Sequence, residues 1–542
     1  MKEQLTIYLL LLTFALQAQQ QDYFIKKYTF RHLNQDIGLP DLAFHNGELV
    51  ARVNLVPNQA NVFFGSCIWS FDEDYNISDT TLLSSSIFSE GIYIEDHLLS
   101  IGIGNPSTDY TTFDMIQIKN YNSPQEEMKR ISLKQDDFNQ VDSRGLFKIH
   151  DEYYMYGRTS DTLPSPHNAS FLMKWNKDLS ATVWTKKIDR NYDYQYIARA
   201  MPTPDDNIVY LLHGSYVGRP DPGEKANNYF IYKVDTSGQV LAQKHIPDDS
   251  RVASSFAPNT PKFILAHSSG KFYIGVSTDF DDRRNSNKRG NIVQLDEEFN
   301  REWSTMIPPH PIFREGDTLP IGAFQTRRNI NVIEEARNGD ILVGGTTIDV
   351  RNTIENDSFI GFTSAYLSRI DHETGEVLWV RNFLFPRDQI RNEVQPYTTS
   401  WIDNIVEDET GDLYAIGNDL KSEYDADSTF KTYQDAFLIK VNAHGCLGGE
   451  DCIDDLVVNN VEEIPVPPRL AYLPPFPNPV ENTLNFEHIP HESYVLYDAS
   501  GRQVKSGRME GQFNMSAMQR GLYILDLITK QGQHLSYKIV KP

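Results

Sequence analysis

The stretch SAYLSRIDHETGEVLWVRNF, Ser364–Phe383, contains two segments in which apolar and polar residues alternate. Such alternation is typical of β-strands that bury one face. Asp371 and the pair Thr374–Gly375 lie between the segments and are residue types that tight turns favour. We therefore predict a β-hairpin here. The preceding stretch NGDILVGGTTID, Asn338–Asp349, adds a strand with the same alternation, so the unit is expected to be an antiparallel meander.

This unit recurs along the chain, for example as NYFIYKVDTSGQVLAQKHI and as DAFLIKVNAHG. The turn residues that follow the central strand of each copy are Asp72, Lys119, Asn176, Asp235, Asp296, Asp371 and Asn442. They are spaced 47 to 75 residues apart. Seven copies of four strands predict an all-β fold, a seven-bladed β-propeller over residues 22–453. Two stacked β-sandwiches would not explain the seven-fold register.

The two ends of the repeat region complement each other. The last copy lacks an outer strand after Asn442, and DYFIKKYTF, Asp22–Phe30, is a strand pattern without a unit of its own. We predict that this N-terminal strand completes the last blade. Cys446 and Cys452 flank LGGED, so a local disulfide is expected to reinforce the same place. Cys67 lies in an apolar strand pattern and is interpreted as a buried small hydrophobic residue.

The N-terminus MKEQLTIYLLLLTFALQAQQQDYF has the layout of a secretory signal peptide. Its apolar run, Leu5–Leu16, is too short to span a bilayer comfortably. We predict cleavage between Ala18 and Gln19, which makes residues 1–18 the signal peptide. A buried N-terminal helix is the alternative interpretation. No later segment reaches the apolar length of a transmembrane helix, so no membrane span is expected in the mature chain.

Composition narrows the possible partners. The 542 residues include 50 Lys and Arg against 74 Asp and Glu, a formal net charge of −24. A surface this acidic repels phosphate backbones, so nucleic acid is not expected as a partner. The hydrophobic fraction of 40% and the aromatic fraction of 12% indicate packed globular structure.

After the repeats the chain changes character twice. Residues 454–471, within DDLVVNNVEEIPVPPRLAYLPP, are acidic and rich in proline, which favours an extended linker. Residues 472–542 contain short strand patterns separated by Gly and Asp turns. We expect them to form a small Ig-like β-sandwich.

Three motifs in this tail occur in a fixed order. PFPNPVENTLNF contains Pro477, Asn478 and Pro479; VLYDASGRQV contains Asp498 and Gly501; and GLYILDLITKQGQ contains Gly521 and Tyr523. Residues 472–542 resemble the type A C-terminal sorting domain of type IX secretion cargo, a family of the Bacteroidetes phylum. A plain Ig-like adhesion domain is the alternative.

The resemblance implies a route for the protein. The signal peptide would carry the chain into the periplasm, and the type IX machinery would recognise the tail and carry the chain across the outer membrane. The expected location is the outer cell surface or the extracellular space. Members of this family commonly lose the tail at the surface, where the cargo is released or joined to an anionic lipopolysaccharide.

The repeat around Asp371, Thr374, Gly375 and Trp379 resembles that of quinoprotein-like, PQQ-like propellers. The Thr-Gly pair would make a tight turn and the Trp would fill the gap between blades, so packing explains the motif. A quinone cofactor would need a platform and calcium ligands that cannot be identified in this sequence. We therefore predict no cofactor, no metal and no catalytic residue.

Chemistry-bearing clusters are few. Asp279–Asn291 mixes carboxylates and arginines and is interpreted as a solvated loop, and Glu407–Asp412 is interpreted as a turn. Histidines occur singly, at 167, 213, 267, 310 and 372 among other positions, without a spacing typical of paired metal ligands.

Two functions remain open. The favoured one is a non-catalytic module that binds a glycan or a protein through long loops such as Arg351–Thr363 and Lys421–Gln434. The alternative is a secreted hydrolase or lyase acting on polysaccharide, with carboxylates converging near the central channel, because propeller sites assemble from distant loops.

Overall fold

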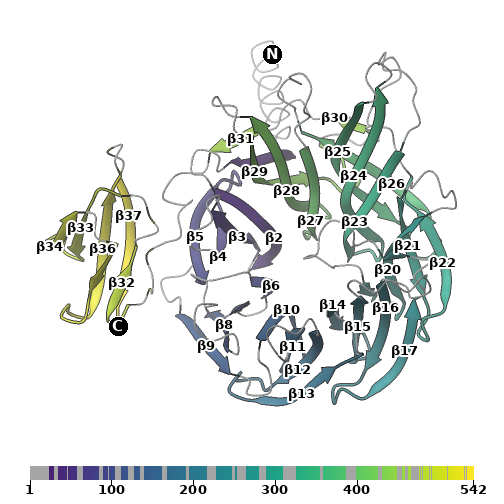
Figure 1. Ribbon diagram of the computed structural model, residues 1–542, viewed down its shortest axis with the longest axis horizontal. Helices are drawn as coiled ribbons and strands as arrows, with labels where there is room; N and C mark the ends of the chain where they lie inside the picture. The colour runs from purple at the N-terminus through teal and green to yellow at the C-terminus, as the bar shows by residue number, and fades with distance from the viewer. Residues whose placement is uncertain are drawn as a thin grey trace, which may run out of the picture.

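The computed structural model describes residues 23–542 with gaps at 30–34, 46, 58–64, 85–88, 95–96, 104–111, 120–126, 135–139, 161–167, 191–193, 216–226, 247–250, 253–263, 280–287, 309–324, 354–357, 386–397, 425–429, 448–454, 458–461, 466–474, 476–477, 479, 487–488, 490, 509–510, 530–531 and 533. The described part is all-β, and Figure 1 shows the sheets formed by β1–β31 arranged around a common centre in a propeller-like fold. No helix among these residues is long and apolar enough to cross a membrane.

The first four sheets are antiparallel and contain consecutive strands. Sheet 1 consists of β2 (Gln35–His45), β3 (Glu48–Pro57), β4 (Gly65–Phe71) and β5 (Ile77–Ser84). Sheet 2 consists of β6 (Ser89–Ile94), β7 (His97–Ile103), β8 (Thr112–Lys119) and β9 (Glu127–Lys134). Sheet 3 consists of β10 (Gln140–Ile149), β11 (Glu152–Ser160), β12 (Asn168–Trp175) and β13 (Thr182–Ile188). Sheet 4 consists of β14 (Tyr194–Pro202), β15 (Ile208–Ser215), β16 (Asn227–Val234) and β17 (Val240–Ile246).

The next three sheets each have five strands. Sheet 5 consists of β18 (Arg251–Val252), β19 (Ile264–Ala266), β20 (Phe272–Asp279), β21 (Lys288–Leu295) and β22 (Arg301–Met306). Sheet 6 consists of β23 (Gln325–Glu335), β24 (Ile341–Thr353), β25 (Ser358–Ile370), β26 (Val377–Leu384) and β30 (Asp455–Val457). Sheet 7 consists of β27 (Thr398–Glu407), β28 (Leu413–Tyr424), β29 (Phe430–Val441), β1 (Phe24–Thr29) and β31 (Glu462–Pro465).

The turn residues chosen from the sequence fall where the prediction requires. Each one ends or directly follows the third strand of its sheet, as Asp235 follows β16 and Lys119 ends β8. The Asp and Asn side chains at these turns accept hydrogen bonds from the backbone; Asp235, for example, binds the amides of Ser237 and Gln239 at 2.9 and 2.8 Å. These Asx turns explain why the hairpins are tight.

The innermost strand is interrupted in every one of the seven sheets. Six first strands (β2, β6, β10, β14, β23 and β27) contain a β-bulge, for example between Ile402 and Asn404. In sheet 5 the innermost strand is split into β18 and β19, which both pair with β20. Bulges increase the local twist, which suits strands crowded around a centre.

The two chain ends meet in sheet 7. β1 pairs antiparallel with β29, with Ile25 opposite Ile439, which is the pairing predicted for the N-terminal strand. The other edge of β1 pairs in parallel with β31, where Lys26 lies opposite Glu462. Sheets 7 and 1 also share an apolar cluster that includes Tyr28, Trp69 and Leu438.

The segment interpreted as an extended linker contributes two strands to the sheets. β30 pairs in parallel with the outer strand β26, and β31 pairs in parallel with β1. Residues 455–457 and 462–465 therefore lie at the outer edges of sheets 6 and 7, and we call these two segments the strap. Ile464 of the strap is partly buried against the cluster shared by sheets 7 and 1.

One large side chain fills the space between an outer strand and the turn of the next sheet. A tryptophan of the outer strand packs against a glycine with positive φ at three boundaries, Trp184 with Gly238, Trp303 with Gly375 and Trp379 with Gly445. These contacts confirm that the repeated tryptophans fill gaps between sheets.

Where the preceding outer strand lacks this tryptophan, the turn residue itself is large. Leu179 and Phe299 have φ of 56° and 62°, a conformation that usually selects glycine, and both are buried.

The tail forms two sheets around one core. A four-stranded sheet contains β34 (Gln503–Arg508), β33 (Ser493–Asp498), β36 (Gly521–Ile528) and β37 (His534–Lys541), and a two-stranded sheet contains β32 (Thr483–Asn485) and β35 (Gln512–Asn514). Side chains of both sheets, such as Leu484, Phe513 and Leu525, belong to the same apolar cluster.

The interpretation of Arg351–Thr363 and Lys421–Gln434 as long loops was wrong. Strand β24 extends to Thr353 and β25 begins at Ser358, while β28 extends to Tyr424 and β29 begins at Phe430. These ranges contain many polar residues, so they lack the apolar alternation that indicates a strand. The strands are formed here by backbone hydrogen bonds between β24 and β25 and between β28 and β29.

Candidate functional site

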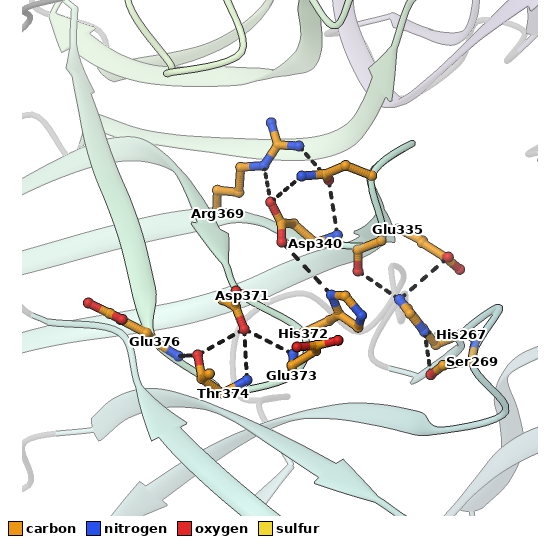
Figure 2. Close-up of polar contacts among 12 residues, drawn as sticks. His267, Ser269, Glu335, Asp340, Arg369, Asp371, His372, Glu373, Thr374 and Glu376 are labelled. Atoms are coloured by element: carbon orange, nitrogen blue, oxygen red, sulfur yellow. Dashed lines mark hydrogen bonds and ion pairs between the residues drawn. The ribbon is translucent and has the colours of Figure 1, made fainter.

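His267, directly after β19, lies in a polar network that joins separate sheets (Figure 2). Its Nε2 lies 2.7 Å from the carbonyl oxygen of Gly339, which can only accept, so Nε2 carries the proton. Nδ1 accepts a hydrogen bond from the amide of Ser269 at 3.0 Å. The side chain is only 1% exposed. In these contacts Nε2 acts as the donor and Nδ1 as the acceptor.

Glu335 at the end of β23 bonds to the same turn of sheet 5. It accepts hydrogen bonds from the amide and hydroxyl of Ser268 at 2.9 and 2.5 Å. Its Oε1 lies 3.4 Å from Nε2 of His267. The carboxylate therefore connects sheet 6 to sheet 5.

His372 stacks on His267, with ring centroids 5.0 Å apart and an angle of 26° between the planes. Its carbonyl oxygen accepts hydrogen bonds from the hydroxyl of Tyr273 at 3.0 Å and from Gln294 at 2.8 Å. Burial raises the pKa of Tyr273 to about 12, so this hydroxyl stays protonated and donates. The turn of sheet 6 is thus held on sheet 5 by side chains from β20 and β21.

Arg369 extends the network to sheet 7. Its Nε donates to Asp340 at 2.8 Å and its terminal nitrogens donate to Asn338 at 2.6 Å and to the carbonyl of Ala443 at 3.2 Å. Asp340 also lies 3.9 Å from Nδ1 of His372. The side chains labelled in Figure 2 therefore join sheets 5 and 6. The hydrogen bond from Arg369 to Ala443 connects them to sheet 7.

Asp371 belongs to the same region and organises its own turn. It accepts hydrogen bonds from the amide and hydroxyl of Thr374 at 2.7 and 2.8 Å and from the amide of Glu373 at 3.0 Å. Hydrogen bonds from Thr374 hold the pKa of the Asp371 carboxyl below its ordinary value. Asp371 and Thr374 of the quinoprotein-like motif thus shape the turn.

The chemistry open to this network is limited. Both ring nitrogens of His267 have protein partners, so the ring has no position left for a substrate. In the part of the chain that the structure describes, no group of three or more His, Cys, Asp and Glu could hold a metal ion. The hydrogen bonds of the network hold sheets 5, 6 and 7 together.

A second polar cluster lies inside sheet 7 and contains three buried carboxylates. Nζ of Lys27 on β1 lies 2.5 Å from Asp419 and 3.4 Å from Asp435. Asp403 accepts hydrogen bonds from Nε1 of Trp401 at 3.0 Å and from Nδ2 of Asn418 at 2.5 Å. The three carboxylates are 1–4% exposed, and Asp419 and Asp435 bind β1 to the sheet through Lys27.

In the tail, the side chain of Asn478 in the Pro-Asn-Pro motif forms hydrogen bonds with the backbone of the last strand, β37. Its Nδ2 donates to the carbonyl of Lys538 at 2.7 Å and its Oδ1 accepts from the amide of Val540 at 2.8 Å. The amide of Val480 donates to the carbonyl of Val540 at 2.8 Å. β37 is the edge strand of its sheet, and these bonds supply partners for backbone N–H and C=O groups on its outer side.

The other tail residues singled out from the sequence have defined structural roles. Asp498 accepts hydrogen bonds from the hydroxyl and amide of Ser500 at 2.5 and 3.0 Å, and Gly501 closes that turn with φ of 80°. Gly521 has φ of 149° at the start of β36. The hydroxyl of buried Tyr523 donates to the carbonyl of Gln519 at 2.7 Å.

Several predicted positions lie outside the described residues, namely Ala18, Gln19, Cys452, Pro477, Pro479, His167 and His310. Most of the loop Asp279–Asn291 also lies outside them. Cys446 is buried, and its pairing with Cys452 stays a prediction. Cys67 is a free, buried thiol, and burial raises its pKa, as expected for a residue of the core.

The sequence reasoning missed the meeting of His267 and His372 because the two residues are 105 positions apart and belong to different repeats. A usable signal was present. Both histidines lie in turns at the same end of consecutive units, one after the first strand and one after the third. Residues at such positions of neighbouring sheets come close together in a radial array.

Comparison with known families identifies the tail. Residues 475–541 match the family described as the secretion system C-terminal sorting domain. The chain therefore carries a type IX sorting domain, which implies interaction with the type IX machinery and secretion to the cell surface or the extracellular space. No curated protein matches the chain.

Solved structures with some similarity include the β-propeller domain of the Trilobed protease from Pyrococcus furiosus, with 9% identity over 74% of this chain and 93% of that one and a TM-score of 0.37. A mutant of the α-L-arabinofuranosidase Arb93A from Fusarium graminearum has 10% identity over 63% and 96%, with a TM-score of 0.36. The α-L-arabinofuranosidase from Lactobacillus brevis has 11% identity over 53% and 91%, with a TM-score of 0.30. These TM-scores are too low to support an inference about fold or activity.

Proposed function

We propose that the seven sheets are the blades of a seven-bladed β-propeller that acts outside the cell as a non-catalytic module for binding a glycan or a protein. The pairing of β1 with β29 and the apolar cluster shared by sheets 7 and 1 support a closed ring. The packing of Trp379 against Gly445 supports a quinoprotein-like repeat whose role is in the fold.

The proposal divides the chain into four parts. Residues 1–18 are a signal peptide, residues 22–453 form the propeller, residues 454–471 are the linker that contains the strap, and residues 472–542 form an Ig-like sandwich that directs export. A disulfide between Cys446 and Cys452 would secure the end of the last blade.

Two neighbouring hairpins carry the binding proposal. β24 and β25 pair over 13 residue positions and β28 and β29 over 12, whereas the corresponding strands of sheets 3, 4 and 5 pair over 8. The excess of four or five residues extends each hairpin by about 14 to 17 Å. Sheets 6 and 7 are neighbours, so the two extensions project side by side. They lie at the end of the sheets opposite the Asx turns, and we call them the tall hairpins.

A polysaccharide hydrolase or lyase remains the second candidate. It would need a pair of carboxylates that a substrate can reach. The buried carboxylates of sheet 7 are each engaged by Lys27, Trp401 or Asn418, which favours the binding module for the described part of the chain.

A glycan array combined with assays for reducing-sugar release tests the proposal on the exported chain. We expect retention of one class of glycan, or capture of one protein partner, without product. Two shortened variants locate the site. One replaces Arg351–Ile360 and the other replaces Lys421–Tyr433 with Asn-Gly, so that strand partners Val350 and Gly361, or Leu420 and Gln434, are joined by a tight turn.

Both shortened variants keep the strand register of their sheets, so we expect an unchanged unfolding midpoint and at least tenfold weaker binding. Turnover of any polysaccharide by the unaltered chain would contradict a binding-only module. Full binding by both shortened variants would contradict the tall hairpins as its location.

A further inference from the structure

The acidic excess of the chain is almost absent at sheets 3 and 4. Residues 140–246 contain 13 Lys or Arg and 12 Asp or Glu. The whole chain has a net charge of −24, so nearly all of its acidic excess lies elsewhere in the sequence. In Figure 1 the outer strands β13 and β17 of these sheets lie on the rim of the ring.

Two lysines on these outer strands bind neutral partners. Nζ of Lys186 donates to the carbonyl of Gly238 at 2.5 Å, and Nζ of Lys244 donates to Oδ1 of Asn300 at 2.8 Å. Each bond reaches the turn of the next sheet, so each ammonium group is held at the boundary between two sheets. Among the described residues, no Asp or Glu forms an ion pair with either lysine. Their charge is therefore available to a ligand.

Other lysines of the same sheets behave differently. Lys174 pairs with Glu152 at 2.5 Å and Lys233 pairs with Asp205 at 2.8 Å. Asp235 is close enough for Lys186 to contribute to lowering its pKa, but its main partners are Ser237 and Gln239 within its own turn. Lys186 and Lys244 on the outer strands thus differ from Lys174 and Lys233 in forming no ion pair with a described residue.

Arg190 lies just after β13 and adds a planar cation between sheet 3, which carries Lys186, and sheet 4, which carries Lys244. Its guanidinium lies over the rings of Phe230 and Tyr232, at 4.1 and 5.2 Å from the centroids. One terminal nitrogen donates to Oε1 of Gln243 at 3.2 Å. The aromatic faces fix the guanidinium without neutralising it, and a guanidinium binds carboxylates through two parallel hydrogen bonds.

Exposed apolar side chains accompany these cations. Val183 on β13 and Val240 and Leu241 on β17 are 53%, 48% and 51% exposed, and they are three of the five large exposed hydrophobic residues among those described. Apolar surface beside separated cations suits the ring faces and carboxylates of an acidic sugar better than it suits a small inorganic anion.

We propose that the outer edges of sheets 3 and 4 bind a linear polysaccharide that carries carboxylate groups. Lys186, Arg190 and Lys244 would contact carboxylates of successive sugars, and the exposed valines and leucine would contact the sugar rings. The acidic charge elsewhere would exclude the polymer from the rest of the surface. This surface is separate from the tall hairpins, so the proposal can be tested independently of the proposed function.

Polygalacturonate and its fully methyl-esterified form are the probes, and binding to the full chain is measured by titration calorimetry at two salt concentrations. We expect binding of polygalacturonate that weakens as salt rises, and at least tenfold weaker binding of the ester. Because the ester comparison uses the unaltered chain, it does not depend on any variant folding.

The variant Lys186→Gln/Arg190→Gln/Lys244→Gln should weaken binding of polygalacturonate at least tenfold. The matched control Lys271→Gln/Arg301→Gln/Arg337→Gln removes the same charge from sheets 5 and 6 and should bind like the unaltered chain. Glutamine keeps a donor for Gly238 and Asn300, and thermal unfolding checks that both variants fold.

Four outcomes would overturn the proposal: no binding of polygalacturonate, equal binding of the ester, equal loss in both triple variants, or tighter binding of double-stranded DNA than of polygalacturonate at the same salt.

Discussion

Trp303 of sheet 5 lies against Gly375 of sheet 6 so closely that a Cβ on residue 375 would be 2.9 Å from the indole Cδ2. Gly375 also has φ of 75°, a conformation that side chains with a Cβ rarely adopt. The turn of one sheet and the outer strand of the previous sheet therefore have to be complementary in size.

Gly375→Ala should destabilise the propeller by about 2 to 4 kcal/mol, because the substitution adds both backbone strain and overlap with Trp303. Gly270→Ala is the matched control. Gly270 has φ of 85° but its Cβ would meet only Glu297, at 3.7 Å, so about 1 kcal/mol is expected. Urea unfolding of the full chain compares them. Equal losses would show that size complementarity with Trp303 has no effect.

Lys27→Met should destabilise the chain by about 3 to 5 kcal/mol, because it leaves Asp419 and Asp435 buried without their cation. The neighbouring Lys26 pairs with Glu462, whose side chain is 63% exposed, so Lys26→Met should cost less than about 1 kcal/mol. The comparison is made by denaturant unfolding. Adding Asp435→Asn to Lys27→Met should restore part of the loss, and no restoration would argue against a charge effect.

Replacing Glu462–Pro465 with a Gly-Ser segment should expose the outer edge of β1. The parallel pairing of Lys26 through Thr29 with the strap would be lost, together with the contact of Ile464 with the shared cluster. Hydrogen exchange followed by mass spectrometry should then show faster exchange in residues 24–29. The same replacement at residues 468–471, beyond the strap, should leave that exchange unchanged, and unchanged exchange in both chains would mean that the strap does not protect β1.

Asn478→Asp tests the hydrogen bonds between Asn478 and the last strand, β37, of the sorting domain. The carboxylate could still accept from Val540, but it would repel the carbonyl of Lys538 to which the amide now donates. We expect the sorting domain to lose about 1 to 3 kcal/mol and the secreted fraction to fall. Immunoblots of medium and periplasm measure that fraction. Gln503→Ala, at an exposed position of the same domain, is the control and should be secreted normally.

Asp498 predicts acid sensitivity of the sorting domain. Hydrogen bonds, first from Ser500, lower its pKa from an ordinary value of 3.8 to about 2 in the folded domain. Because the folded pKa is the lower one, the stabilisation is present above pH 3.8 and is lost as the pH falls toward about 2. Thermal unfolding of Asp498→Asn should therefore depend less on pH across this window. An identical pH dependence in both chains would argue against a role for this turn.

Much of the fold could be predicted from local patterns. The hairpin turns follow from Asp and Gly at fixed places, and the pairing of β1 with β29 follows from a missing strand at one end and an unmatched strand at the other. The sequence also allowed the prediction that Trp379 fills the gap between neighbouring sheets, where it packs against Gly445.

Other features depend on three-dimensional packing and left no local pattern. The strap lies in an acidic segment that is rich in proline, and Ile464 packs against the shared cluster. Its two short described segments pair in parallel and show no clear alternation of apolar and polar residues. The contact between His267 and His372 depends on the angle between sheets 5 and 6. Lys186 and Lys244 differ from Lys174 in their hydrogen-bond and ion-pair partners, which the sequence does not reveal.

The closure of the ring by the N-terminal strand is the central claim, and a cross-link tests it most directly. Phe24 and Lys440 are opposite each other in β1 and β29, so Phe24→Cys/Lys440→Cys should form a disulfide within one chain under mild oxidation. Phe24→Cys/Lys505→Cys, which places the second thiol in the tail, should not. Peptide mass spectrometry that finds the Phe24→Cys to Lys440→Cys link in a folded chain supports closure, and its absence under conditions that oxidise the chain would contradict it.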